Sequence, residues 1–307
     1  MRPLRGISYK IASVLVFTVM AVLIKAVADR VPPGEAVFFR SLFAIPVIMG
    51  WLAWRRELAT GLRTVQPLGH VWRGVVGTSA MGLGFAGLAY LPLPEVTAIG
   101  YAAPLLTVVF AAMFLGEQVR FFRMASVALG MAGVLIVLSP RLTTLQNGQV
   151  ETAEALGAML VLGGAVFAAL AQVFVRKLVL TESTSAIVFW FSATSTVLSF
   201  VTLPFGWVMP DPAEMVMLVA VGLLGGVGQI LLTSSYREAH ASVVAPFEYV
   251  SMLFSLAFGY FLFAEVPTLT MLFGAALVVT AGILIIWRER QLGIERAKQR
   301  KVMTPQG

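Results

Sequence analysis

Glu248 invites a chemical explanation, because it lies inside the apolar stretch HASVVAPFEYVSMLFSLAFGYFLFAE at 240–265. Roughly 20 apolar residues in a helix, rising about 1.5 Å each, cover the ~30 Å hydrocarbon core of a bilayer, so this stretch predicts a transmembrane helix. An ionisable side chain at that depth is costly unless it has a partner or a function. Pro246 lacks an N–H and weakens the helix beside it. The pattern favours a substrate or proton site.

The sequence leaves two uses of Glu248 open. It lies roughly 9 Å inside one end of its span, whereas Arg40 lies roughly 7 Å inside the opposite end of another, so we expect the two to be too far apart to pair. Without a nearby cation, burial would raise the pKa of Glu248 and let it carry a proton or bind a substrate ammonium group. The alternative is a neutral carboxyl group that is satisfied by a helix backbone.

Two cations also lie in or near apolar spans, and both could attract a substrate carboxylate. Lys25 has Asp29 one helical turn away, so an ion pair on the helix surface with snorkelling is a sufficient alternative. Arg40 could contact a substrate, or it could form a gate by pairing with Asp29, Glu35 or Glu95.

Uncharged polar and aromatic side chains complete the candidates. Gln172 and Gln229 are amides in apolar spans, suited to a hydrogen bond with a substrate or, more commonly, with a neighbouring helix. Aromatic side chains could form a wall for an apolar moiety or receive a cation, although most membrane aromatics serve packing. The candidates of this kind are Tyr101, Trp190, Phe247 and Tyr249.

The composition places these residues in an integral membrane protein. Charged residues make up 12% and hydrophobic residues 59% of the chain, and the mean hydropathy is +0.89, whereas a soluble domain carries roughly 25% charged residues. No cysteine is present, so disulfides, thiolate metal sites and cysteine nucleophiles are excluded. The two histidines, His70 and His240, lack neighbouring metal ligands, and no hydrolase set stands out. We therefore expect no metal, no cofactor and no enzyme.

The apolar runs predict an all-α membrane protein with ten transmembrane helices. The predicted spans are 9–28, 36–54, 72–91, 95–116, 121–139, 155–175, 184–205, 213–235, 242–264 and 269–287. The predicted parts are a first repeat at 1–139, a periplasmic linker at 140–154, a second repeat at 155–287 and a basic cytoplasmic tail at 288–307.

The net charge of +7 follows the predicted spans. With both termini in the cytoplasm, 18 of the 22 Lys and Arg residues, Lys10 and Arg73 among them, lie on the cytoplasmic side, and only Arg30 and Arg141 fall in outer loops, as the positive-inside rule requires. The basic tail favours membrane contact rather than nucleic acid. The first span imitates a secretory signal that ends at 26–28, but Lys25 directly before that triplet disfavours cleavage, so we expect the span to be retained.

The two halves end alike. The sequences at 98–138 and 246–287 align so that Glu117 matches Glu265, at an offset of 148 residues. Five spans per half is an odd number, so the halves lie in opposite orientations and form an inverted repeat, the geometry of alternating access.

Glycine patterns call for a choice between cofactor binding and packing. Residues 82–87 match G-x-G-x-x-G, but they lie within one apolar span instead of between a strand and a helix, so we expect close helix packing there and not a dinucleotide. Gly222 and Gly226 predict the same kind of packing.

The chain resembles the EamA-type members of the drug/metabolite transporter superfamily over about residues 8 to 287. The resemblance rests on Lys25, on Arg40, and on the runs APLLTVVFAAMFLGE at 103–117 and APFEYVSMLFSLAFGYFLFAE at 245–265. The second half departs from the pattern at 190–192, which lack a counterpart to Arg40. The resemblance implies two five-helix repeats and export of small metabolites, often amino acids, across the inner membrane. Some related proteins take up S-adenosylmethionine instead.

These observations predict a secondary transporter, with an amino acid or related compound as substrate, the lipid bilayer as surroundings and protons as a candidate coupling ion. A lipid flippase, a receptor and a membrane enzyme are the other classes. Substrate, direction, coupling ion and oligomeric state, including a homodimer, stay open.

Overall fold

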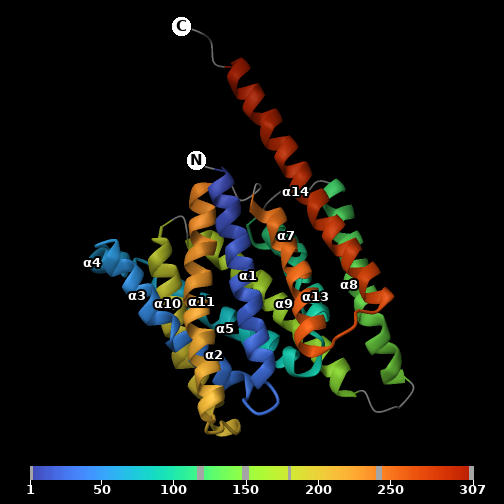
Figure 1. Ribbon diagram of the computed structural model, residues 1–307. Helices are drawn as coiled ribbons and strands as arrows, with labels where there is room; N and C mark the ends of the chain where they lie inside the picture. The colour runs from blue at the N-terminus through green and yellow to red at the C-terminus, as the bar shows by residue number, and fades with distance from the viewer. Residues whose placement is uncertain (1–2, 116–120, 147–151, 179–180, 240–243, 304–307) are drawn as a thin grey trace.

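The computed structural model describes residues 3–115, 121–146, 152–178, 181–239 and 244–303. Every regular element in these ranges is a helix, and the long helices run side by side as one bundle (Figure 1). We call the side at which α1 begins, at the top of Figure 1, the terminal side, and the opposite side the far side.

Eight helices come before the stretch at 147–151 and seven after it, in the described part of the chain. The first group is α1 (Pro3–Val27), α2 (Pro33–Leu42), α3 (Ala44–Trp54), α4 (Leu58–Gly61), α5 (Pro67–Tyr90), α6 (Leu93–Gly100), α7 (Ala102–Leu115) and α8 (Phe121–Gln146). The second group is α9 (Thr152–Leu178), α10 (Thr184–Ser199), the 3-10 helix η1 (Phe200–Phe205), α11 (Pro212–Glu238), the 3-10 helix η2 (Ala245–Tyr249), α13 (Val250–Phe263) and α14 (Leu269–Met303).

The ten predicted spans are confirmed. Seven stretches are long and apolar enough to cross a bilayer, and the apolar helices 124–140 and 247–263 are shorter. The remaining span is α5, whose 24 residues have the length to cross a bilayer but include His70 and Arg73. The long C-terminal helix, α14, continues through the predicted tail to Met303. The predicted linker is partly helical, because α8 extends to Gln146 and α9 begins at Thr152.

Four spans are interrupted, and prolines account for the interruptions. Proline cannot donate a hydrogen bond to the carbonyl four residues earlier. Pro46 thereby frees the carbonyl of Leu42, where α2 ends, and Pro104 frees that of Gly100, where α6 ends. In the second half Pro204 lies within η1 and Pro246 at the start of η2. The weakened helix that the sequence predicts around Pro246 is confirmed.

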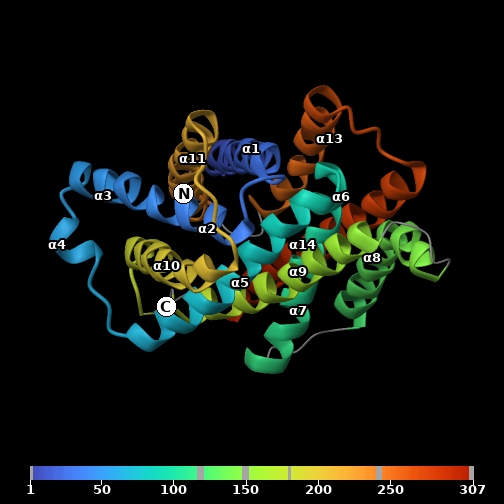
Figure 2. The same ribbon diagram turned by 90° about the horizontal axis from the view of Figure 1, so that it is seen from below.

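The two halves are interleaved. The main packing pairs are α1 with α11, α5 with α9, and α8 with α14, and each pair takes one helix from each half. The view from below shows α1 beside α11 and α5 beside α9 (Figure 2). In the repeat, α1 corresponds to α9 and α5 corresponds to α11. The pseudo-two-fold relation between the halves therefore maps the α1–α11 pair onto the α9–α5 pair. The inverted repeat is therefore present in the helix packing as well as in the order of the helices along the chain.

Small residues allow the closest contacts. A Cβ atom on Gly222 would lie 2.3 Å from the Cβ of Phe43, and one on Gly226 would lie 2.7 Å from the Cβ of Val47. The predicted packing role of these two glycines is confirmed. Within the G-x-G-x-x-G match, only Gly87 has such a neighbour, whereas nothing lies within 4 Å of a Cβ built on Gly82 or Gly84.

Replacing Gly133 with alanine is expected to destabilise the protein by about 1–3 kcal/mol, because overpacking forces helices apart. A Cβ at Gly133 would lie 2.7 Å from the carbonyl oxygen of Gly274, where α8 meets α14. The control is Gly82→Ala, for which the gain in helix propensity should leave stability unchanged or slightly raised. Thermal unfolding of both variants in detergent measures the contrast, and equal midpoints would contradict the close contact.

Candidate functional site

Two tyrosines meet where a span of each half is interrupted. Tyr101 lies between α6 and α7, and Tyr249 is the last residue of η2, directly before α13. The two are equivalent under the repeat offset, and their rings pack edge to face with centroids 5.0 Å apart. The Tyr101 hydroxyl lies 2.6 Å from Ser251 Oγ and donates to the carbonyl of Tyr249 at 3.4 Å. The contact therefore marks the pseudo-two-fold axis between the halves.

Glycine makes room for one of these rings. A Cβ on Gly282 of α14 would lie 1.5 Å from the Tyr249 hydroxyl oxygen, whereas a Cβ on Gly100 would meet nothing within 4 Å. Tyr249 can therefore occupy this position only because α14 carries glycine there.

Beside Tyr249, Glu248 forms an ion pair and hydrogen bond with Lys10 of α1. The Lys10 side chain is 2% exposed and that of Glu248 is 49% exposed. The expectation that no cation lies near Glu248 is wrong, because α1 begins at Pro3 and thereby carries Lys10 two turns into the bundle, next to η2. The carboxylate thus joins the two halves and remains accessible.

A second ion pair joins the halves at the far side. Lys25 Nζ lies 3.1 Å from Glu265 Oε1, and both side chains are largely buried. Lys25 also donates to the carbonyls of Leu91, at 2.7 Å, and Leu88, at 3.2 Å, at the end of α5. These terminal carbonyls lack helix partners and attract a cation. Lys25 therefore pairs across the bundle and not with Asp29.

The other oxygen of Glu265 fixes the start of α6. Glu265 Oε2 accepts a hydrogen bond from the backbone N–H of Leu93 at 2.8 Å. One carboxylate thus holds α1, the α5–α6 connection and the end of α13 together. This contact joins α1 to the end of α13 at the far side.

Arg40 lies apart from both ion pairs. Only 5% of it is exposed, and its guanidinium carbon lies 5.6 Å from the ring centroid of Phe191 on α10. Arg73 of α5 lies over the same ring, at 4.0 Å. The sequence placed Arg73 on the cytoplasmic side, but α5 begins at Pro67 and its guanidinium reaches into the bundle.

The remaining predicted residues are dispersed. Phe247 is partly buried in η2 beside Glu248. Trp190 donates its indole N–H to the carbonyl of Leu62 at 3.0 Å. Gln172 is exposed on α9, and Gln229 is partly buried on α11. The structure therefore brings together Tyr101, Phe247, Glu248 and Tyr249 of the predicted set, and leaves Trp190 and Gln172 elsewhere.

Outside the spans, Glu182 in the loop before α10 holds the segment that precedes α5. It accepts hydrogen bonds from the Thr64 hydroxyl and from the backbone N–H groups of Val65 and Gln66, at 2.7–2.8 Å. Burial raises the pKa of Glu182, but these hydrogen bonds and nearby His70 outweigh burial and leave the pKa below its ordinary value. Glu182 is thus an ionised structural anchor.

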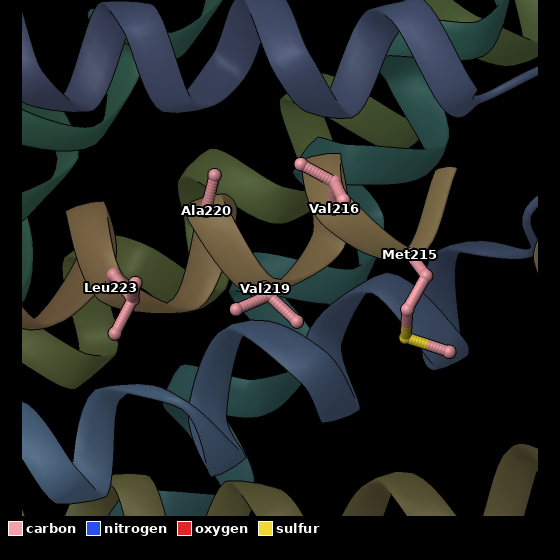
Figure 3. A pocket seen from close by; sticks show the side chains of 5 residues that line it. All are labelled: Met215, Val216, Val219, Ala220 and Leu223. Atoms are coloured by element: carbon pink, nitrogen blue, oxygen red, sulfur yellow. The ribbon is translucent and has the colours of Figure 1, made fainter. Parts of the chain in front are cut away.

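A shallow apolar groove of about 310 Å³ lies along α11, lined by Met215, Val216, Val219, Ala220 and Leu223 (Figure 3). It offers no polar group to orient a metabolite. No cluster of three or more potential metal ligands occurs in the ranges that the structure describes.

Comparison with known proteins decides the family. A family model described as the EamA-like transporter family matches residues 4–139 and 155–287. The chain belongs to the EamA-like transporter family. It is therefore a multi-pass membrane transporter and not an enzyme, and the resemblance found in the sequence is confirmed.

Individual EamA-like relatives differ in substrate and direction. A pseudopaline exporter of Pseudomonas aeruginosa is 29% identical over 91% of this chain and 95% of its own. An S-adenosylmethionine uptake transporter of Rickettsia felis is 26% identical over 94% of both chains. A solved crystal structure covers 95% of this chain and 99% of its own, with a TM-score of 0.65 at 19% identity, so the two share the fold.

Proposed function

We propose that this EamA-like transporter exports an amino acid or related small metabolite by alternating access, with protons as the coupling ion. The observation that carries the proposal is that two ion pairs join α1 to the two ends of the span that η2 and α13 form. Lys10 pairs with Glu248 before α13 begins, and Lys25 pairs with Glu265 after it ends. The two lysines lie about 22 Å apart along α1.

Ion pairs at both ends of one helix–helix contact suit a two-state mechanism. Opening toward the terminal side would separate Lys10 from Glu248 while Lys25 and Glu265 hold the far side closed. Opening toward the far side would require the reverse. The tyrosine pair between these ends would then line the path, with Phe247 and Glu248 beside it.

Proton coupling through Glu248 has a structural basis. Its carboxylate is accessible, whereas its partner Lys10 is buried. Protonation would remove the charge that attracts Lys10 and so favour separation of the pair. We propose cytoplasmic termini and residence in the inner membrane, on the distribution of Lys and Arg residues.

Counterflow into liposomes that contain the purified protein tests the proposal. We expect saturable exchange of a radiolabelled amino acid, and accumulation when a pH gradient is imposed. Saturable exchange without any response to the gradient would remove proton coupling and keep the transporter. No flux of any amino acid would overturn the substrate assignment.

Uptake of S-adenosylmethionine is the second candidate, because several relatives that cover most of this chain carry that name. The same liposomes distinguish the two: exchange of S-adenosylmethionine without exchange of amino acids would favour uptake.

A further inference from the structure

Two arginines from the first half meet one aromatic ring from the second half. Arg40 of α2 and Arg73 of α5 both lie over the ring of Phe191 on α10, at 5.6 and 4.0 Å from its centroid. Their guanidinium carbons are therefore separated by no more than the sum of these distances, which is about 10 Å. We call Arg40, Arg73 and Phe191 the arginine pair site.

Two glycines leave space around these guanidinium groups. A Cβ on Gly77 would lie 1.9 Å from Arg73 Nη1 and 2.8 Å from the Phe191 ring. A Cβ on Gly225 of α11 would lie 3.0 Å from Arg40 Nε. The arginine pair site thus occupies the meeting point of α2, α5, α10 and α11.

No anion complements this charge in the described part of the chain. Arg40 Nε and both Arg73 Nε and Nη1 are buried without a hydrogen-bond partner, and no ion pair reaches either guanidinium among the described residues. Two acidic groups are engaged elsewhere: Glu35 accepts from the N–H of Val208, and Glu182 accepts from the N–H of Gln66. The gate pairing predicted for Arg40 therefore finds no support.

Such an arrangement is unfavourable unless something completes it. Arginine stays protonated in proteins, so neither group can escape by losing its proton. One cation–π contact returns less free energy than the burial of an unpaired cation costs. The two cations also repel each other. An oxyanion between them would relieve both the burial cost and the repulsion.

We propose that the arginine pair site binds the carboxylate or phosphate group of a net-negative metabolite, such as an acidic amino acid or a dicarboxylate. This inference rests on the proposed transport function and narrows its substrate class. A planar guanidinium fork matches carboxylate and phosphate oxygens, and two forks favour a ligand with more anionic than cationic groups. Neutral amino acids and the sulfonium of S-adenosylmethionine fit less well.

Ligand-dependent thermal unfolding of the full-length protein in detergent tests the site without requiring transport. The probes are aspartate, succinate, inorganic phosphate and leucine at constant ionic strength. The variants are Arg40→Met and Arg73→Met, with Arg63→Met, an exposed arginine, as the matched control. We expect the acidic probes, but not leucine, to stabilise wild type and the control, and each site variant to weaken their apparent affinity at least about tenfold.

The unliganded midpoint separates loss of the site from misfolding. Removal of an uncompensated buried cation should leave that midpoint unchanged or raised, whereas a damaged fold would lower it. Comparison of aspartate and succinate with phosphate tells carboxylate from phosphate recognition. Equal stabilisation by leucine, or an undiminished response of both site variants to the acidic probes, would overturn the proposal. If neutral amino acids show counterflow but the acidic probes do not bind, this inference is wrong and the transport function stands. If the acidic probes bind but no substrate shows flux, the transport function is wrong and the anion site stands.

Discussion

Replacing Glu248 with glutamine is expected to flatten the pH dependence of transport and to slow transport roughly thirtyfold, because the loss of a charge-assisted hydrogen bond costs about 2 kcal/mol. The amide keeps the size of the side chain but neither titrates nor carries the charge that pairs with buried Lys10. Both the opening and the closing of the terminal side should be affected, since the Lys10 contact forms in one state and breaks in the other. Initial rates in liposomes over a series of pH values measure both effects.

The matched control is Glu57→Gln, which removes a carboxylate from an exposed ion pair with Arg55. Exposed pairs of this kind contribute little, so the control should keep the rate and pH profile of wild type. Glu248→Asp should restore part of the pH dependence. If Glu248→Gln keeps the wild-type pH profile, Glu248 does not couple protons.

Replacing Glu265 with glutamine is expected to open the far side. The glutamine oxygen can still accept the N–H of Leu93, so the change removes mainly the charge that attracts Lys25. If the pair stabilises the closed state by about 2 kcal/mol, its loss raises the open population roughly thirtyfold. Transport should then become limited by return to the closed state.

The absence of cysteine in the natural chain makes this opening measurable. Ser255 of α13 is buried, with its hydroxyl 2.7 Å from that of Thr97 on α6. The Ser255→Cys variant should react with a membrane-impermeant maleimide much faster in the Glu265→Gln background than in the wild-type background. Arg30→Gln is the control, since it removes an exposed far-side cation. Equal labelling in all three backgrounds would show that Lys25 and Glu265 do not gate access.

The helices were predictable because membrane burial leaves a strong trace in sequence. The lengths of the apolar runs predicted the ten spans, and Pro246 predicted one interruption. The interruptions before Pro46 and Pro104 follow from the same rule as the one at Pro246. The inverted orientation followed from an odd span number.

The partners of the charged residues were less predictable. Lys10 and Arg73 both lie near the cytoplasmic ends of their predicted spans, where a cation normally indicates only the orientation of the span. Longer helices carried both into the bundle. The hydrophobic pattern predicts the spans, but it does not predict which span of one half contacts which span of the other. Neither the Lys10–Glu248 pair nor the shared contact with Phe191 could therefore be predicted from the sequence. Trp190 was selected in place of its neighbour, Phe191, since one sequence offers no means to tell packing aromatics apart.

The interleaving of the two halves has a consequence for biogenesis. Because α1, α5 and α8 find their main partners in α11, α9 and α14, the first half can bury little of its packing surface while it alone has entered the bilayer. Its helices must wait, inserted but unassembled, until translation delivers the rest. A ribosome that stalls between the halves would therefore leave a product exposed to membrane quality control. Separate expression of the two halves as two chains should, for the same reason, yield neither half in stable form without the other.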